Sequence, residues 1–140
     1  MEPVMEAFKW TDKYRTHIRP IDKQHRELFE RLNMLTLAVY KGECKKNLRE
    51  LGDFFGNYIE EHFGLEEELI RRGNYPDYVS HVLEHDRFRK MFRDFMVELD
   101  RRGGDSYLAI QIEKDLRRWW ENHILKSDMR YVPHISAPED

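Results

Sequence analysis

The sequence contains very little cysteine, with Cys44 as the single thiol among 140 residues. One cysteine cannot form an internal disulfide, which agrees with a reducing compartment. No apolar run reaches membrane-spanning length, and the first residues lack the basic start and apolar stretch of a secretory signal. We therefore expect a cytoplasmic protein that does not insert into a membrane.

An excess of charge of one sign is also missing, because the formal net charge is only -3. Lys and Arg alternate with Asp and Glu, so no basic stripe could follow a phosphate backbone, and we expect no nucleic-acid partner. Charged residues make up 36% and hydrophobic residues 40% of the chain, a mixture typical of amphipathic helices with solvated outer faces. The length suits a single domain over residues 1–140.

Strand-like alternation is absent as well, and hydrophobic residues instead recur at helical spacing in four runs. We predict an arm over residues 1–21, helices over about 22–41, 45–72, 77–102 and 106–127, and a short tail over 128–140. Asp22 is the expected N-cap of the first helix, and Gly42 is its expected stop. Short connections near residues 42, 74 and 104 favour antiparallel neighbours. The predicted fold is all-α, an up-down-up-down antiparallel four-helix bundle.

Polar residues interrupt the apolar faces of these helices at six positions: His25, His62, Glu66, His81, His85 and His123. His62 and Glu66 are four residues apart, as are His81 and His85, so each pair projects from one helical face. At a rise of ~1.5 Å per residue, antiparallel helices bring all six to one level of the bundle. Any one histidine could be a hydrogen-bonded core residue, but an inert core would not leave the whole set unpaired. The pattern predicts a buried metal site.

Asp128 is a less certain member of this set, because it follows His123 by five residues. That spacing is roughly 140° around a regular α-helix, so Asp128 joins the site only if the helix loosens or ends there. Glu67 and Glu68, beside Glu66, are expected on the solvated face.

In these segments the sequence resembles the hemerythrins, specifically bacterial single-domain ones. The resemblance rests on Ile21-Asp22-Lys23-Gln24-His25, His62-Phe63-Gly64-Leu65-Glu66-Glu67, His81 with His85, and His123-Ile124 with Asp128. It extends to Trp10, Tyr14, Leu28-Phe29, Tyr75-Pro76 and Trp119, and so covers nearly the whole chain.

The resemblance implies two iron ions joined by an oxo or hydroxo bridge. It places His81, His85 and His123 on one iron, His25 and His62 on the other, and Glu66 and Asp128 between them. One coordination position of the second iron then stays open, and dioxygen would bind there. Zinc also binds imidazoles, but it favours separate tetrahedral sites and has no redox change with which to bind oxygen.

An apolar wall around the open position would exclude water, and it is expected to consist of Leu28, Phe29, Phe63, Trp119, Trp120 and Ile124. Trp120 departs from the family pattern, which usually has leucine three residues before the last histidine, facing the oxygen pocket. We expect Trp120 to narrow oxygen access; the alternative is an outward-tilted surface tryptophan.

The implied function is reversible dioxygen binding, for storage, transport or delivery to an oxygen-using enzyme, by a protein that is not itself an enzyme. Two alternatives remain open: a sensor of oxygen, nitric oxide or redox state, and a diiron peroxidase or nitric-oxide-reducing enzyme. His17 could be an extra donor at the site, but a surface position is favoured, as it is for His134. Cys44 is interpreted as an incidental thiol, and a monomer is expected.

Overall fold

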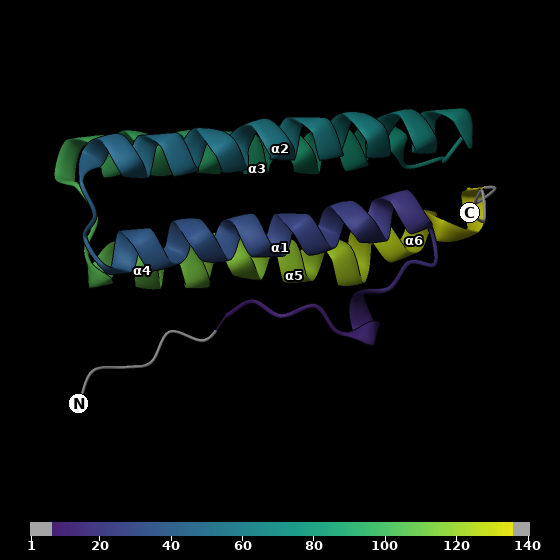
Figure 1. Cartoon of the computed structure of the whole chain (residues 1–140). Coiled ribbons are helices and arrows are strands. Elements are labelled where there is room, and N and C mark those ends of the chain that lie inside the picture. Colours follow the sequence, from purple (N-terminus) through teal and green to yellow (C-terminus); the bar gives the residue numbers. More distant parts are fainter. Residues whose placement is uncertain (1–6, 136–140) are drawn as a thin grey trace.

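The computed structural model describes residues 7–135, which form four helical rods. The rods lie side by side along one long axis (Figure 1). Three rods are single helices, α1 (Arg19–Tyr40), α2 (Lys45–Arg72) and α3 (Tyr78–Arg102). Helix α1 packs against α2 and the final rod, and α3 packs against the same two neighbours. The described residues contain no strand, so the predicted all-α four-helix bundle is confirmed.

The final rod is one helical path built from five short segments. These are α4 (Ser106–Gln111), the π-helix η2 (Ile112–Arg117), α5 (Arg118–Asn122), the π-helix η3 (His123–Asp128) and α6 (Met129–Tyr131). A 3-10 turn, η4 (Val132–His134), follows. The helical path therefore runs past residue 127, where the sequence analysis ended the helix, and Asp128 lies within it rather than in a tail.

Two turns close helices with left-handed residues. Gly42 has φ +66° after α1, and its N–H donates to the carbonyl of Val39 while the N–H of Glu43 donates to that of Ala38. This pair of hydrogen bonds is a Schellman motif, which confirms Gly42 as the stop. After α2 the left-handed residue is Asn74, with φ 53°, one position beyond the C-cap Gly73.

The prediction that Asp22 caps α1 is wrong, because the helix begins three residues earlier and Ile18 occupies the N-cap. Asp22 is instead a buried residue of the first turn. Its carboxylate accepts hydrogen bonds from the backbone N–H and hydroxyl of Thr16, at 2.9 and 2.8 Å, and from the N–H of His17 at 3.1 Å. Asp22 thereby ties the N-terminal arm to α1.

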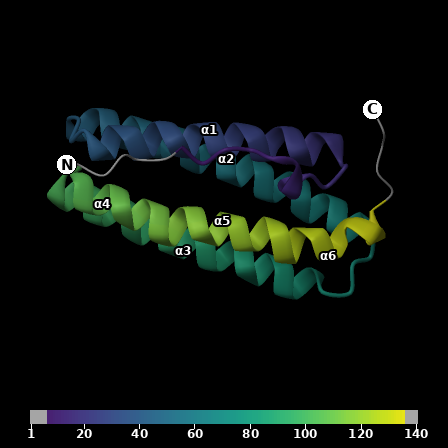
Figure 2. The same cartoon turned by 90° about the horizontal axis from the view of Figure 1, so that it is seen from below.

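The arm includes the 3-10 turn η1 (Asp12–Tyr14) and runs along the outside of the bundle, between α1 and α5 in the view of Figure 2. The ring of Phe8 stacks on Phe29 of α1 with centroids 3.6 Å apart. The side chain of Asn33 holds both backbone polar groups of Phe8, at 2.7 and 3.0 Å. These contacts cover the flank of the bundle with ordered chain.

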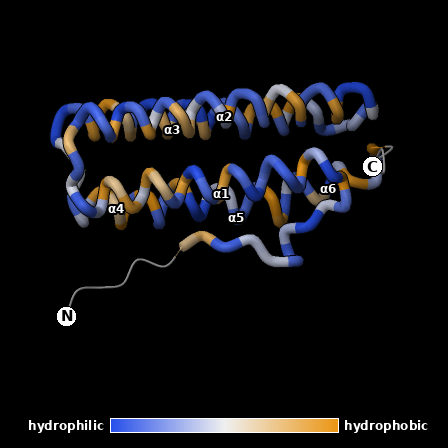
Figure 3. The backbone as a smooth tube through the Cα atoms, in the orientation of Figure 1, coloured by the Kyte–Doolittle hydropathy of each residue, from blue (hydrophilic) through white to orange (hydrophobic). Residues whose placement is uncertain are grey.

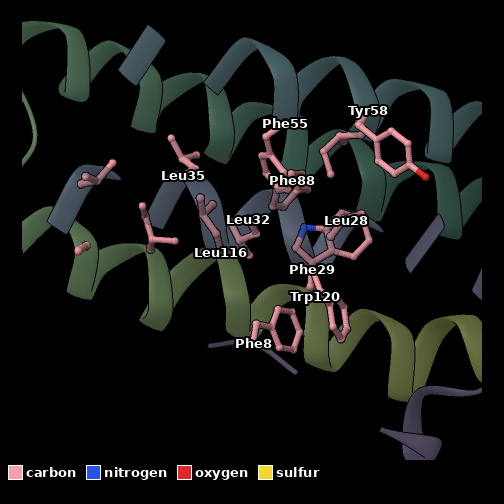
Figure 4. Packing of buried hydrophobic residues seen from close by; sticks show 14 of the residues in the cluster. Phe8, Leu28, Phe29, Leu32, Leu35, Phe55, Tyr58, Phe88, Leu116 and Trp120 are labelled. Carbon is pink, nitrogen blue, oxygen red and sulfur yellow. The ribbon is translucent and has the colours of Figure 1, made fainter. Parts of the chain in front are cut away.

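Hydrophobic and hydrophilic residues alternate around each rod (Figure 3), and the hydrophobic ones pack inward as two separate clusters. The larger cluster includes Leu28, Phe55, Phe88, Leu116 and Trp120, which Figure 4 shows pointing into the space between the helices. The smaller one, at the other end, consists of Ile18, Ile21, Ile70, Tyr75 and Tyr131. Among residues 7–135, no helix is both long and apolar enough for a membrane span.

Candidate metal centre

A layer of buried polar side chains separates the two apolar clusters. It contains the seven residues predicted as ligands: His25, His62, Glu66, His81, His85, His123 and Asp128. Each is at most 2% exposed, and together they come from α1, α2, α3 and η3. The side chains that the sequence placed at one height therefore meet in space. We call this set the polar layer.

The polar layer divides into two groups that share Glu66. One group consists of Glu66, His81, His85 and His123, and the other of His25, His62, Glu66 and Asp128. Within each group, one ligand atom from every residue lies within 4.8 Å of the others. Neighbouring groups with a common carboxylate are an arrangement suited to two metal ions with a bridging ligand.

The two carboxylates each reach both groups. Oε1 of Glu66 lies 2.7 Å from Nε2 of His81, and Oε2 lies 3.4 Å from Nε2 of His62. Oδ1 of Asp128 lies 3.2 Å from Nε2 of His81, and Oδ2 lies 3.3 Å from Nε2 of His25. Each carboxylate therefore lies close to histidines of both groups.

The π-helix η3 explains how Asp128 reaches the layer. In a regular α-helix, residues five apart point in different directions, whereas i→i+5 hydrogen bonding aligns them on one face. Because η3 spans His123–Asp128, both residues point into the bundle, and Oδ1 of Asp128 lies 3.1 Å from Nε2 of His123. The helix therefore loosens between His123 and Asp128, which is the condition that the sequence set for Asp128 to join the site.

The protein alone does not satisfy this layer. Both ring nitrogens of His25, Nε2 of His62 and both carboxylate oxygens of Asp128 are buried without a hydrogen-bond partner in the described chain. Nε2 of His85 and Nε2 of His123 are only 3.1 Å apart. Two nitrogens bonded at right angles to one metal ion, at about 2.1 Å, would be separated by about 3 Å. The donor set therefore fits metal ions.

Charge is distributed unevenly in the metal-free layer. Burial raises the pKa of Glu66, but hydrogen bonds from histidines outweigh it and hold that pKa well below its usual range. Burial lowers the pKa of His81, yet the neighbouring carboxylates of Asp128 and Glu66 raise it to about 9. The pKa of His123 is raised for the same reasons, whereas burial lowers that of His62. Metal ions entering this layer must displace protons.

Three polar side chains behind the layer contact the outer ring nitrogens. Nδ1 of His85 lies 2.7 Å from Glu67, and Nδ1 of His123 lies 3.1 Å from Glu84. Nδ1 of His62 lies 2.8 Å from the amide oxygen of Gln24. Glu67 was expected on the solvated face rather than as a ligand; it belongs to neither donor group, but its side chain is only 20% exposed and contacts His85.

Three residues that contact the layer were not predicted to do so from the sequence: Glu84, Gln24 and Tyr131. Helical spacing offered a signal for Glu84, because it lies three residues after His81 on the inner side of α3. Tyr131 is fully buried, and its hydroxyl donates to Oε2 of Glu66 at 2.9 Å. Its position was hidden because the sequence analysis ended the helix at residue 127.

The aromatic residues expected around the site differ in their contacts. Phe63 is buried and stacks on His85 with centroids 3.8 Å apart. Trp119 stacks on His123 at 4.4 Å and is only partly buried. Trp120 is 0% exposed, and its ring centroid lies 5.8 Å from that of His62. The alternative of a surface Trp120 is therefore wrong.

The remaining predicted wall residues are also buried. Leu28 and Ile124 are 0% exposed and belong to the larger apolar cluster beside the layer. Phe29 is buried mainly under the arm, where Phe8 stacks on it.

Three further residues that the sequence singled out lie on the surface. His17, His134 and the free Cys44 are exposed. His17 has φ 68° and uses its backbone N–H, rather than its ring, to bind Asp22. The surface interpretation of all three agrees with the structure.

Known proteins share both the sequence pattern and the fold. The profile described as Hemerythrin HHE cation binding domain matches residues 16–135. Bacteriohemerythrin of Stenotrophomonas maltophilia is 30% identical over 133 residues, which cover 95% of this chain and 84% of that protein. Hemerythrin subunit 1 of Golfingia vulgaris is 29% identical over 133 residues, covering 95% and 97% of the two chains.

Solved structures agree with these matches. The crystal structure of a hemerythrin variant aligns with a TM-score of 0.82 and 25% identity, covering 95% of this chain and 100% of that one. A wild-type hemerythrin structure aligns with the same TM-score at 24% identity, covering 94% and 100%, and shows the shared fold. The sequence matches and the polar layer lead to one conclusion: the chain belongs to the hemerythrin family.

Proposed function

We propose that the polar layer holds two iron ions joined by an oxo or hydroxo bridge, and that this centre binds dioxygen reversibly. The observation that carries the proposal is the sharing of Glu66 between two groups of buried donors. A shared carboxylate holds two metal ions close together, as one two-electron centre requires. When bound, the iron pair supplies the electrons for reversible oxygen binding.

We assign His81, His85 and His123 to one iron and His25 and His62 to the other. Glu66 and Asp128 bridge them, because the oxygens of each face histidines of both groups. The second iron then has one protein ligand fewer, and its open position would receive dioxygen. Imidazoles outnumber carboxylates five to two in this set. Anionic oxygen ligands stabilise the high oxidation states of iron, so a set with few of them stabilises those states weakly. This ligand set favours binding oxygen over activating it.

The apolar wall supports reversibility. Phe63 and Trp120 are fully buried, with centroids 5.5 Å apart, and Leu28 and Ile124 are buried beside them. A dry wall excludes water and the protons that would promote irreversible loss of reduced oxygen. The five histidines and two carboxylates of the layer are all used as ligands under this assignment, so none of them remains to act as a general acid or base. We therefore favour an oxygen carrier, store or donor to an oxygen-using enzyme.

One spectroscopic experiment separates oxygen carriage from diiron enzyme activity. The iron-loaded protein is reduced without oxygen, exposed to air and then degassed, while its visible absorption is recorded. A new absorption band that persists in air and disappears on degassing supports carriage. Rapid irreversible bleaching with turnover of peroxide or nitric oxide would indicate an enzyme instead. Failure to take up two iron ions per chain would contradict the proposed centre.

A further inference from the structure

The two groups of the polar layer differ in what stands behind their histidines. In the three-histidine group, Nδ1 of His85 faces Oε2 of Glu67 at 2.7 Å, and Nδ1 of His123 faces Oε1 of Glu84 at 3.1 Å. Both carboxylates are held in place: Arg89 approaches Glu67 at 3.6 Å, and the Ser127 hydroxyl donates to Glu84 at 2.7 Å. Two of the three imidazoles therefore have an anion behind them.

Among residues 7–135, the two-histidine group has no anion in the equivalent positions. Nδ1 of His62 faces the neutral amide oxygen of Gln24 at 2.8 Å. Nδ1 of His25 is buried and has no hydrogen-bond partner in the described part of the chain. The two groups share Glu66 and lie in the same buried layer, so this difference in partners distinguishes otherwise similar metal positions.

Such partners change the strength of a metal ligand. A carboxylate that accepts a hydrogen bond from Nδ1–H fixes the tautomer, leaves the Nε2 lone pair directed at the metal and makes the imidazole a stronger donor. An amide oxygen fixes the tautomer but adds no negative charge. Loss of an outer carboxylate typically weakens metal binding by about 10- to 100-fold.

We infer that Glu67 and Glu84 are positioning residues that make the three-histidine position the tighter of two metal sites, so that metal loads there first and reaches the position of His25 and His62 second. This inference rests on the proposed two-metal centre. Loading of the second position would then limit formation of an oxygen-binding protein, because a chain with one metal ion lacks half of the centre.

The test is a titration of the metal-free protein with Co²⁺, followed by visible absorption and by competition with a chelator of known affinity. We expect two binding steps, with the first about tenfold or more tighter than the second. His25→Gln should abolish the second step and preserve the first. Loss of the first step in this variant would overturn the proposed order.

Three substitutions then address the outer partners. Glu67→Gln and Glu84→Gln should each weaken the first step by about 10- to 100-fold, and Gln24→Glu should tighten the second step. A purely structural role would not produce this gain of affinity. Glu68→Gln is the matched control, because Glu68 neighbours Glu67 but pairs with Arg71 and Arg72 outside the layer.

The outcomes separate this inference from the proposed function. The inference would be overturned if the wild type bound two ions with equal affinity. It would also be overturned if Glu67→Gln, Glu84→Gln and Gln24→Glu bound metal with the affinities of the wild type. Either result would leave the two-metal centre standing. Uptake of fewer than two ions by the wild type would overturn both. Far-UV circular dichroism of each metal-free variant shows whether a weaker step reflects lost structure, and Gln24→Glu decides the matter if both Gln variants unfold.

Discussion

The large apolar cluster and the polar layer lie side by side in one bundle but are stabilised in opposite ways. Around Phe55 and Phe88 the fold buries hydrocarbon and gains free energy from removing it from water. A few turns along the same helices, the layer buries five imidazoles and two carboxylates, which burial alone destabilises. The apolar cluster therefore provides stability, whereas the layer is retained for binding.

The largest effect is expected from Glu66→Gln, which removes the carboxylate that the two groups of the layer share. Oε1 of Glu66 lies 2.7 Å from His81 and 2.8 Å from His85, and its other oxygen lies 3.4 Å from His62. Removing its charge should prevent stable binding of two iron ions and abolish the oxygen-dependent absorption. The measurement is iron per chain after anaerobic loading. Retention of two ions at wild-type affinity would refute the bridging role.

The next largest effect is expected from Phe55→Ala, which removes a buried ring from the apolar cluster. Phe55 is 0% exposed and packs edge-on against Phe92, with centroids 5.3 Å apart. Deleting its ring should lower the free energy of unfolding by about 3–5 kcal/mol, measured by urea denaturation of the metal-free protein. Two metal ions should still bind to the folded fraction.

The control for this variant is Val97→Ala on α3, where the side chain is 67% exposed. A surface change of this kind should alter stability by less than about 0.5 kcal/mol. Equal effects of the two variants would show that the cluster is not where the stability resides.

The sequence predicted the apolar cluster and the layer unequally well. Hydrophobic periodicity located all four rods, and i,i+4 spacing identified His62 with Glu66 and His81 with His85, because both signals depend only on regular helix geometry. The π-helix η3 departs from regular α-helix geometry. The sequence therefore indicated that Asp128 could join the layer only if the helix loosened, but it could not show that the helix does so.

The outer partners were harder to predict still. The position of Glu67 within α2 predicts a solvent-exposed side chain. The contact with His85 arises only because α3 packs beside α2. Trp120 was expected at the pocket, but the sequence left a surface position open as the alternative. In the structure, η2 and η3 lie on either side of α5, and Trp120 is fully buried. The residues of one helix do not show which side chains of the other helices lie beside it.

A smaller effect is expected from Trp120→Leu at the boundary between the two regions. The indole packs 5.5 Å from Phe63, and its Nε1 is buried with no hydrogen-bond partner in the described residues. Leucine loses packing but removes an unsatisfied donor, so stability should fall by only about 1–2 kcal/mol. Oxygen association and dissociation, measured by stopped flow and flash photolysis, should both become faster. Unchanged rates would show that Trp120 does not restrict access.

The last effect concerns pH, and it separates the two regions without any mutation. Burial lowers the pKa of His81, but the carboxylates of Asp128 and Glu66 raise it from 6.5 to about 9 in the metal-free fold. A raised folded-state pKa means that the folded protein holds its proton more tightly than the unfolded chain. The resulting stabilisation is complete below pH 6.5 and is lost as the pH rises through about 9.

We therefore expect the free energy of unfolding of the metal-free protein to decline between pH 6.5 and 9, measured by urea denaturation. The lowered pKa of His62 does not interfere, because its titration lies below 6.5. Bound metal replaces the proton, so the decline should shrink in the loaded protein. The decline should persist in Phe55→Ala and weaken in His81→Gln, because the apolar cluster has no charge to titrate. A decline of equal size in His81→Gln would place its origin outside this histidine, and His123, whose pKa is raised in the same direction, is the group to replace next.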